Sequence, residues 1–291
     1  MIEIIPADQL SLREQAGLFT EAFAGYIGGS FEMDSTGLAR FLCVQGADLC
    51  HSRFARSAGR LCGFGYINCT GGITRIAGMG VLPAVRRTGV ARQLLQHLIA
   101  EARERSDEAI VLEVIEQNPA AHALYKGAGF RDVAHLLGWR RTARANAREP
   151  LKGSDALTQT SLMSATQVPS ALEFPELPWA VSRHAVAKVF AAKAYSCDKA
   201  TIVISDPKGI APIRVHFLSI PESGANEWVA LRQALTALLQ RFPGREFFTP
   251  PVFPERFGRE VFAPLDFVQE TLAQFLMRYD PNAAWEGSCE P

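Results

Sequence analysis

The sequence has no excess of charge of either sign, because 30 lysines and arginines balance 30 aspartates and glutamates over 291 residues. Broad nucleic-acid binding needs a basic patch, and this composition gives no surplus from which to build one. No stretch reaches the roughly 18 consecutive apolar residues of a membrane-spanning helix. The first residues, 1–6, resemble a strand rather than a signal peptide. We therefore expect a soluble, cytoplasmic protein with no nucleic-acid or membrane partner.

Cysteine and histidine are scarce, and neither follows a ligand pattern. The six cysteines include no C-x-x-C pair and stand mostly inside apolar runs. The six histidines show no metal-ligand spacing. We therefore expect buried free thiols rather than a disulfide framework, and no metal.

Two common phosphate-binding motifs are also absent. The sequence has no G-x-x-x-x-G-K-[ST] loop, and no G-x-G-x-x-G follows a predicted strand. What is present is a strand at 73–81, which Pro83 ends, and a helix that starts near Gly89. An apolar stripe at helical spacing marks this helix: Ala91, Leu94, Leu95, Leu98 and Ala102.

The turn between this strand and this helix suits an anion. It carries Arg86, Arg87 and Gly89. The first N–H groups of a helix have no acceptor within it, and the helix macrodipole favours negative charge there. Gly89 has no side chain and Ala91 has only a methyl group, so a phosphate can reach the backbone here. We therefore predict a pyrophosphate-binding turn at 81–91.

A second pattern follows one helix and one strand later. An apolar strand is predicted over 108–116, and Asn118 is suited to cap the helix after it. Two segments then resemble motifs of the GNAT N-acetyltransferases. The acyl-CoA motif [QR]-x-x-G-x-[GA] is matched by Arg86-x-x-Gly89-x-Ala91, and the fourth-helix signature is matched by Asn118-x-x-Ala121-x-x-Leu124-Tyr125-x-x-x-Gly129-Phe130.

This resemblance implies an α/β (α+β) GNAT fold, with a mixed, mostly antiparallel sheet and helices on both faces. In that fold the strands at 73–81 and 108–116 splay apart and admit the pantetheine arm of acetyl-CoA, the implied co-substrate. The residues that it implies for acetyl-CoA binding are Met79, Gly80, Val81, Arg86, Arg87, Thr88, Gly89, Val90, Ala91, Asn118, Ala121 and Tyr125.

The resemblance also implies direct attack of an amine on the thioester in a ternary complex, with Tyr125 protonating the leaving thiolate. A lysine-like amine is protonated at pH 7, so a base must take its proton. Glu113 and Glu116 are the candidates, and they face opposite sides of one strand. Glu113 is favoured because it interrupts an apolar run, although a structural salt bridge is an alternative reason for it. Glu32 and Asp34 are the next candidates for this base.

The N-terminal region is predicted to form helices at 10–23 and 35–44 and an antiparallel meander of strands at 48–55, 60–69 and 73–81. Between the two helices lies an irregular segment at 25–34. In GNAT proteins this region commonly lines the acceptor pocket, so the resemblance implies acceptor binding by Tyr26, Phe31 and Glu32. Aromatic side chains that simply fill the core are the alternative.

The second half is predicted to repeat the first in a degenerate form. We expect a GNAT domain at 1–142, a polar linker at 143–172 with one short strand at 157–163, and an incomplete GNAT-like domain at 173–291. The second domain is predicted to contain a helix at 179–192, strands at 199–205 and 213–220, a helix at 228–242 and a last strand at 274–279. The first domain is predicted to end in a closing strand pair at 130–137 and 138–140. The turn at 222–226 lacks both arginines and carries Glu222, so the second copy should not bind acyl-CoA.

The sequence therefore predicts an N-acetyltransferase that moves an acetyl group from acetyl-CoA to a primary amine of a small molecule or protein. We expect a monomer or a homodimer. Two alternatives stay open: an acyl-CoA binding or sensing protein without transfer, and a transferase with a longer acyl donor.

Overall fold

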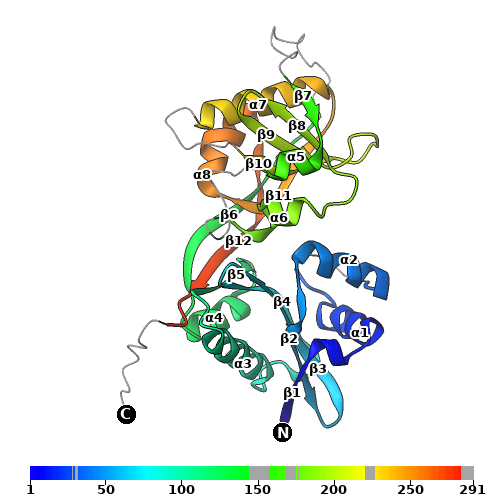
Figure 1. Ribbon diagram of the computed structural model, residues 1–291, viewed down its shortest axis with the longest axis vertical. Coiled ribbons are helices and arrows are strands. Elements are labelled where there is room, and N and C mark those ends of the chain that lie inside the picture. Colours follow the sequence, from blue (N-terminus) through cyan, green and yellow to red (C-terminus); the bar gives the residue numbers. More distant parts are fainter. Residues whose placement is uncertain are drawn as a thin grey trace. The chain divides into compact units, whose positions relative to one another are not determined.

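The computed structural model describes residues 1–27, 29, 32–143, 157–167, 175, 177–219 and 227–282. The chain forms two compact units (Figure 1). Unit 1 comprises Met1–Val114, Asn118–Val133 and Leu276–Pro291, and unit 2 comprises Ile115–Gln117 and Ala134–Phe275. Two long strands, β6 (Arg131–Arg141) and β12 (Val268–Tyr279), each contribute residues to both units.

Unit 1 contains a mixed sheet in the order β1-β2-β3-β4-β5, with β12 as the next neighbour of β5. The pairs from β1 to β4 are antiparallel, and β4 pairs with β5 in parallel. Its elements are β1 (Ile2–Pro6), α1 (Leu12–Ala22), α2 (Ser35–Gln45), β2 (Asp48–Ser57), β3 (Arg60–Thr70), β4 (Ile73–Val81), the 3₁₀ turns at Ala7–Gln9 and Pro83–Val85, α3 (Val90–Glu104), β5 (Ala109–Ile115) and α4 (Pro119–Gly127). The predicted meander, both first helices and the mixed sheet are confirmed.

Local sequence signals start the helices of unit 1. Ser11 and Glu14 form a reciprocal capping box at the start of α1. The Oδ1 atom of Asp34 accepts the N–H of Gly37 at 2.6 Å, so Asp34, rather than Ser35, caps α2.

Helices cover both faces of this sheet (Figure 1). Successive side chains of β3 point to opposite faces and contact different helices. Phe64 and Tyr66 pack with α1 and α2, and a Cβ at Gly65 would lie 2.8 Å from Leu98 of α3. The predicted two-faced architecture is therefore confirmed.

Unit 2 has the strand order β12-β6-β11-β10-β9-β8-β7. The pair of β10 and β11 is parallel, and the pairs β6/β11, β9/β10, β8/β9 and β7/β8 are antiparallel. Its further elements are β7 (Thr158–Thr160), α5 (Leu162–Gln167), a 3₁₀ turn (Trp179–Val181), α6 (Arg183–Val186), β8 (Lys193–Cys197), β9 (Ala200–Ile204), β10 (Ile213–Ser219), α7 (Glu227–Arg241), β11 (Phe247–Pro254), α8 (Glu255–Phe257), a π-helical turn (Gly258–Phe262) and a 3₁₀ turn (Ala263–Leu265).

Unit 2 repeats the order of unit 1. In each unit a central strand, β4 or β10, pairs antiparallel with the strand before it and parallel with the strand after it. A helix of 15 residues, α3 or α7, connects the two parallel strands. The prediction of a tandem repeat is thus confirmed at the level of topology.

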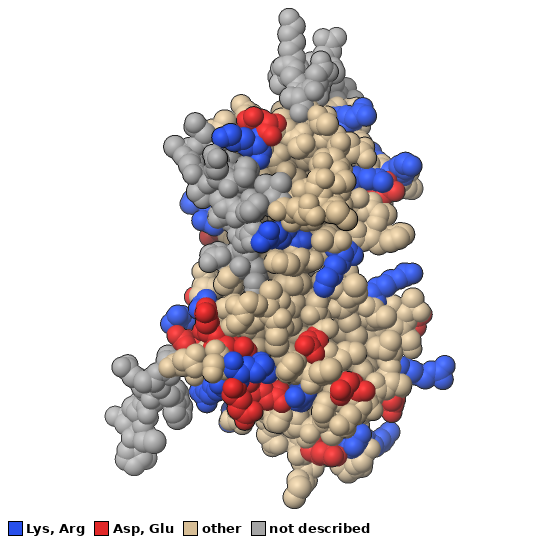
Figure 2. Space-filling view, in the orientation of Figure 1, with Lys and Arg blue, Asp and Glu red and all other residues tan. Residues whose placement is uncertain are grey.

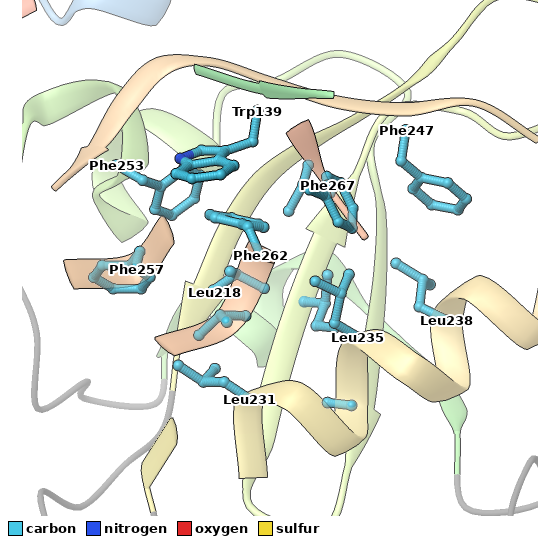
Figure 3. Close-up of a cluster of buried hydrophobic side chains, with 14 of the residues drawn as sticks. Trp139, Leu218, Leu231, Leu235, Leu238, Phe247, Phe253, Phe257, Phe262 and Phe267 are labelled. Carbon is cyan, nitrogen blue, oxygen red and sulfur yellow. The ribbon is translucent and has the colours of Figure 1, made fainter. Parts of the chain in front are cut away.

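The core of unit 2 is built around α7 and aromatic side chains (Figure 3). Leu231, Leu235 and Leu238 of α7 are fully buried in the same cluster as Leu218 of β10. Five aromatic residues close this cluster from β6, β11 and the turns after it: Trp139, Phe247, Phe253, Phe257 and Phe262. Burial of so many large side chains supplies most of the stability of this unit.

Several predicted elements differ from those observed. The closing pair at 130–140 is one strand, β6, because Gly138 continues in the ladder and packs against β11. The helix predicted at 179–192 is two short turns, since Ala191 adopts a positive φ of 58° and the chain then enters β8. The strand predicted at 157–163 is β7 followed by α5, and the last strand begins at Val268. Strands β8 and β11 were not predicted.

The cysteine prediction was partly wrong. Cys62 and Cys197 are buried, but Cys43, Cys50 and Cys69 are exposed, and all five are free thiols. Alternation explains Cys69, because it follows a buried residue near the end of β3 and points to the other face.

The compact units do not coincide with the predicted domains. Residues 134–142, expected in the first domain, pack in unit 2, and residues 276–282, expected in the second, pack in unit 1. The reason is that β6 leaves unit 1 as a continuous strand and β12 returns from unit 2. The boundaries at 142 and 173 therefore stay predictions about domains rather than descriptions of the compact units.

Candidate active site

The candidate site lies in unit 1, where β4 and β5 part. The parallel pairing runs from Ile73 with Ala109 to Ile76 with Leu112. The register of β4 with β3 shifts immediately afterwards, between the pairs Tyr66–Gly78 and Ile67–Ile76. From Ala77 to Val81 every residue of β4 is only partly buried. The bulge thus turns β4 away from β5 and leaves Met79, Gly80 and Val81 accessible.

Gly80 is required at this position by packing. A Cβ there would lie 3.0 Å from the ring of Phe64 and 3.3 Å from Ala22 of α1. Any larger residue would push β4 away from α1. Close packing against Phe64 and α1 therefore fixes the position of this partly exposed end of β4.

The turn after β4 has the backbone conformation that the sequence suggested. Arg87 and Gly89 have positive φ angles of 67° and 92°, and Gly89 is the N-cap of α3. A Cβ at Gly89 would meet no atom within 4 Å, so the space above this turn is open. The Thr88 hydroxyl donates to the Val85 carbonyl at 2.7 Å and closes the turn. The turn thus leaves room beside Gly89 at the start of α3, which suits a pyrophosphate.

Arg86 has a structural contact in addition to its predicted role. Its guanidinium donates to the Ala22 carbonyl at the end of α1 at 3.0 Å. This bond fastens the turn to the helix that precedes the predicted acceptor segment. The predicted contact of Arg86 with a pyrophosphate stays a prediction.

Asn118 and Tyr125 occupy the predicted positions on α4. The Oδ1 atom of Asn118 accepts the N–H of Ala121 at 3.2 Å and caps the helix. Tyr125 is buried, with 7% of its surface exposed, and its ring lies 5.8 Å from that of Phe130. Burial raises the pKa of the Tyr125 phenol well above its usual value, with a smaller contribution from Tyr26. The phenol is protonated at neutral pH, as an ordinary tyrosine is, and burial keeps it so.

Tyr26 is the predicted acceptor residue that lies near this helix. Burial raises the pKa of its phenol, and the nearby Asn118 side chain acts to lower it. Of the other predicted acceptor residues, Glu32 is exposed and Phe31 lies outside the described residues. Tyr26 is therefore the described acceptor candidate that the structure brings to Asn118 and Tyr125.

Glu113 is held in a buried ion pair. Both of its carboxylate oxygens accept hydrogen bonds from Arg75, at 2.7–3.2 Å, and the two side chains are only 10% and 6% exposed. Arg75 also donates to the Oε1 atom of Gln45 at the end of α2, at 2.9 Å. The alternative explanation of Glu113, a structural salt bridge, is thus the one that its contacts favour.

Sequence reasoning missed Arg75 and Gln45. The signal was present, because Arg75 and Glu113 both interrupt apolar strands that pair with each other. Opposite charges inside two neighbouring strands predict a cross-strand pair.

Glu116, the second base candidate, lies in unit 2. Its carboxylate is 3.1 Å from the Nε2 atom of His135, and both side chains are partly exposed, at 42% and 34%. The His135 ring stacks on Phe275 at 5.1 Å. The reserve candidate Asp34 is occupied by its capping bond to Gly37.

The equivalent region of unit 2 differs in two respects. Residues 215–219 of β10, which correspond to the accessible end of β4, are all buried. The Phe262 carbonyl accepts the Phe267 N–H at 3.2 Å, as the Tyr125 carbonyl accepts the Phe130 N–H at 3.0 Å. By this match Phe262 is the counterpart of Tyr125 in unit 2, and it is buried in the hydrophobic cluster that Figure 3 shows. The turn at 222–226, on which the sequence argument rested, lies outside the described residues.

Comparisons with known proteins agree with this geometry. Residues 19–130 match the model of the Acetyltransferase (GNAT) family. A tandem GNAT protein from the clavulanic acid biosynthesis pathway has the same fold, with a TM-score of 0.61 and 17% identity over 98% of this chain and 100% of that one. Residues 19–130 are thus similar to the GNAT acetyltransferases. The chain as a whole has the fold of a tandem GNAT protein.

Two curated GNAT relatives match only part of the chain. A ribosomal protein bS18-alanine N-acetyltransferase from Salmonella typhimurium is 37% identical over 68 residues, 23% of this chain and 46% of that protein. The N-alpha-acetyltransferase RimI from Mycobacterium tuberculosis is 35% identical over 97 residues, 32% of this chain and 60% of that protein. The chain thus spans about half the length of the curated relatives it matches.

Charged side chains of both signs are mixed on the face that Figure 2 shows. Basic and acidic side chains lie side by side over α3 and α4 (Figure 2). Within the described ranges, no group of three or more histidine, cysteine, aspartate or glutamate side chains could hold a metal ion. Nor does any helix of the described residues have the length and apolarity to cross a membrane.

Proposed function

We propose that this GNAT protein transfers an acetyl group from acetyl-CoA to a primary amine, and that unit 1 alone does so. The observation that carries the proposal is the combination, in one unit, of an accessible β4 end, an open turn at the start of α3 and a buried phenol on α4. Unit 2 has neither the accessible strand end nor the phenol.

The residues of unit 1 fit acetyl-CoA. Backbone N–H groups of Thr88, Gly89, Val90 and Ala91 would bind the pyrophosphate, with Arg86 and Arg87 adding positive charge. Accessible backbone at Met79, Gly80 and Val81 would bind the pantetheine arm, and Asn118 and Ala121 would line it on the α4 side. The co-substrate supplies the acetyl group as a thioester.

The chemistry assigned to the protein is proton transfer. As the amine nitrogen bonds to the acetyl carbon, the C–S bond breaks and the thiolate takes the Tyr125 proton. The amine must lose a proton as well. The Arg75 cation pairs with Glu113, and Glu116 belongs to unit 2. We therefore propose that the amine proton passes to water rather than to either glutamate.

The acceptor is proposed only as a class. Tyr26, Phe31 and Glu32 are the proposed acceptor contacts. By their names, one matched relative acetylates an alanine of ribosomal protein bS18, and the other is an N-alpha-acetyltransferase. An α-amino group has a pKa of about 8, so a large fraction is neutral near pH 8 and needs only a weak base. An alanine-terminated peptide therefore belongs among the amines tested, and a cytoplasmic location stays a prediction.

Free-thiol release from acetyl-CoA over a panel of amines tests the proposal. With the best amine, Tyr125→Phe should lower kcat more than about tenfold, because general acid catalysis contributes ~10²–10⁴. Tyr66→Phe is a matched control, since its buried hydroxyl donates to Gln15 at 2.9 Å, away from α4. Binding of acetyl-CoA without transfer to any amine would favour the sensing alternative, and turnover with longer acyl-CoA alone would favour a different donor.

A further inference from the structure

The carbonyl of Ala22, the last residue of α1, receives its hydrogen bond from outside the helix. The N–H of Tyr26, four residues further on, donates to the Phe23 carbonyl at 3.0 Å instead. The last carbonyls of a helix carry the negative end of its macrodipole, which favours a cation beside them. Arg86 is that cation, because its Nη2 atom donates to the Ala22 carbonyl at 3.0 Å. The predicted pyrophosphate turn therefore caps α1.

The end of α1 also contacts the strand that the proposed function assigns to the pantetheine arm. A Cβ at Gly80 would lie only 3.3 Å from the Cβ of Ala22, so β4 and α1 approach closely here. Leu82, which follows β4, packs in the same hydrophobic cluster as Ala22 and Phe19. Packing and the Arg86 bond thus hold the end of α1 against both parts of the proposed acetyl-CoA site.

The predicted acceptor segment at 25–34 is attached to the same half of α1. Near its start, the Tyr26 ring lies edge-on to that of Phe23, with 5.0 Å between the ring centroids. Near its end, the Met33 N–H donates to the Thr20 hydroxyl at 2.9 Å. Because both ends of the segment are anchored on the last turns of α1, the position of α1 sets the position of the segment.

One arginine can serve both sites. A guanidinium has five N–H groups, and the bond to Ala22 uses one of them. Arg86 is exposed and stands three residues before Gly89, the N-cap of α3. Its other N–H groups can therefore pair with phosphate oxygens bound at the start of α3, in the forked geometry that suits arginine.

We propose that Arg86 is a positioning residue for the acceptor segment: its guanidinium caps α1 and pairs with the pyrophosphate at the same time, so that bound acetyl-CoA steadies the loop that receives the amine. This inference rests on the proposed acetyl transfer and adds a coupling between its two substrates. Acetyl-CoA raises the affinity for the amine, and by linkage the amine raises the affinity for acetyl-CoA by the same factor.

Steady-state kinetics of two variants of the full chain test the coupling. Arg86→Gln removes the cap of α1. Arg87→Gln is the matched control, because Arg87 is an exposed cation of the same turn and, within the described residues, has no hydrogen bond to α1. Both variants should raise the KM for acetyl-CoA. At saturating acetyl-CoA, Arg86→Gln should raise the KM for the best amine about three- to tenfold, the equivalent of one hydrogen bond, with kcat within about threefold. Arg87→Gln should leave the KM for the amine within about twofold.

Hydrogen exchange gives a second readout that needs no turnover. Coenzyme A is the probe, because it carries the pyrophosphate but no acetyl group. In wild type, saturating coenzyme A should slow amide exchange at least about twofold in peptides that contain Ala24 and Tyr26. In Arg86→Gln these peptides should exchange faster, and coenzyme A at a saturating concentration should no longer protect them. In Arg87→Gln the protection should remain.

Three results would overturn the inference alone. A rise in the KM for acetyl-CoA only, in Arg86→Gln, would make Arg86 a pyrophosphate contact without an effect on the acceptor segment. An equal rise in the KM for the amine in both variants would show that the charge of the turn, and not the cap, is responsible. Unchanged exchange at the end of α1 in Arg86→Gln would show that the bond to Ala22 does not hold the segment. Wild-type protein that releases no thiol with any amine would instead refute the proposed function, and the inference with it.

Discussion

The ion pair between Arg75 and Glu113 gives the sharpest prediction, because it separates a structural carboxylate from a catalytic base. Arg75→Met would leave the Glu113 carboxylate, only 10% exposed, without its cation. Removing one partner of a buried pair costs about 3–5 kcal/mol, whereas replacing both by apolar residues is often nearly neutral. We therefore expect a loss of roughly 6–20 °C in Tm for Arg75→Met. Most of this loss should be recovered in Arg75→Met/Glu113→Leu.

Glu113→Gln completes this test by adding activity to stability. If Glu113 is structural, the variant should lose Tm while kcat stays within about threefold, whereas loss of a general base lowers kcat by ~10²–10⁴. Glu101→Gln is the matched control, since Glu101 pairs with Arg53 at 2.5 Å and the two side chains are 16% and 13% exposed. Thermal denaturation followed by circular dichroism and the thiol-release assay give both readouts. A fall in kcat of more than a hundredfold at unchanged Tm would refute the structural assignment.

Two further predictions concern stability. Tyr279→Ala should destabilise unit 1 by about 3–5 kcal/mol, because its ring packs on Gly129 and Phe130 and its hydroxyl accepts a hydrogen bond from Arg103. A shift in Tm of under 1 °C would show that the end of β12 is dispensable. Burial, reinforced by Arg214, lowers the pKa of His216 to about 3 from an ordinary value of 6.5, so its neutral form stabilises unit 2 above pH 6.5 and this contribution is lost as pH falls toward 3. His216→Gln should flatten the decline of Tm between pH 6.5 and 4, and an unaltered decline would mean that other groups cause it.

The fold of unit 1 was largely predictable because its signals are local. Turn residues with positive φ, at Ala58–Gly59 and Gly71–Gly72, set the hairpins, and capping residues such as Asp34 set the helix starts. The parallel step from β4 to β5 follows from a strand, a 15-residue helix and a strand.

The exchange of strands between the units was not predictable from such signals. β12 lies next to β5 although their sequences are more than 150 residues apart, and only tertiary packing selects that neighbour. Residues around β11 also misled the prediction, because Pro250, Pro251 and Pro254 are unusual in a strand. The register shift between Thr249 and Phe253 accommodates them.

For the candidate site, sequence identified the residue types better than their partners. Asn118, Tyr125 and Gly89 stand where the motifs placed them. The partners of Glu113 and of Arg86 come from separate elements, which no motif in the sequence reveals.

The most direct test of the central claim, a single acyl-CoA site in unit 1, is a calorimetric titration of the full chain with acetyl-CoA. We predict one molecule bound per chain. Thr88→Glu, which places a carboxylate at an exposed position beside the start of α3, should abolish this binding by repulsion of the pyrophosphate. Its Tm should be no lower than that of Thr88→Ala, which also removes the bond to the Val85 carbonyl. Two molecules per chain, or binding that survives Thr88→Glu, would contradict the account.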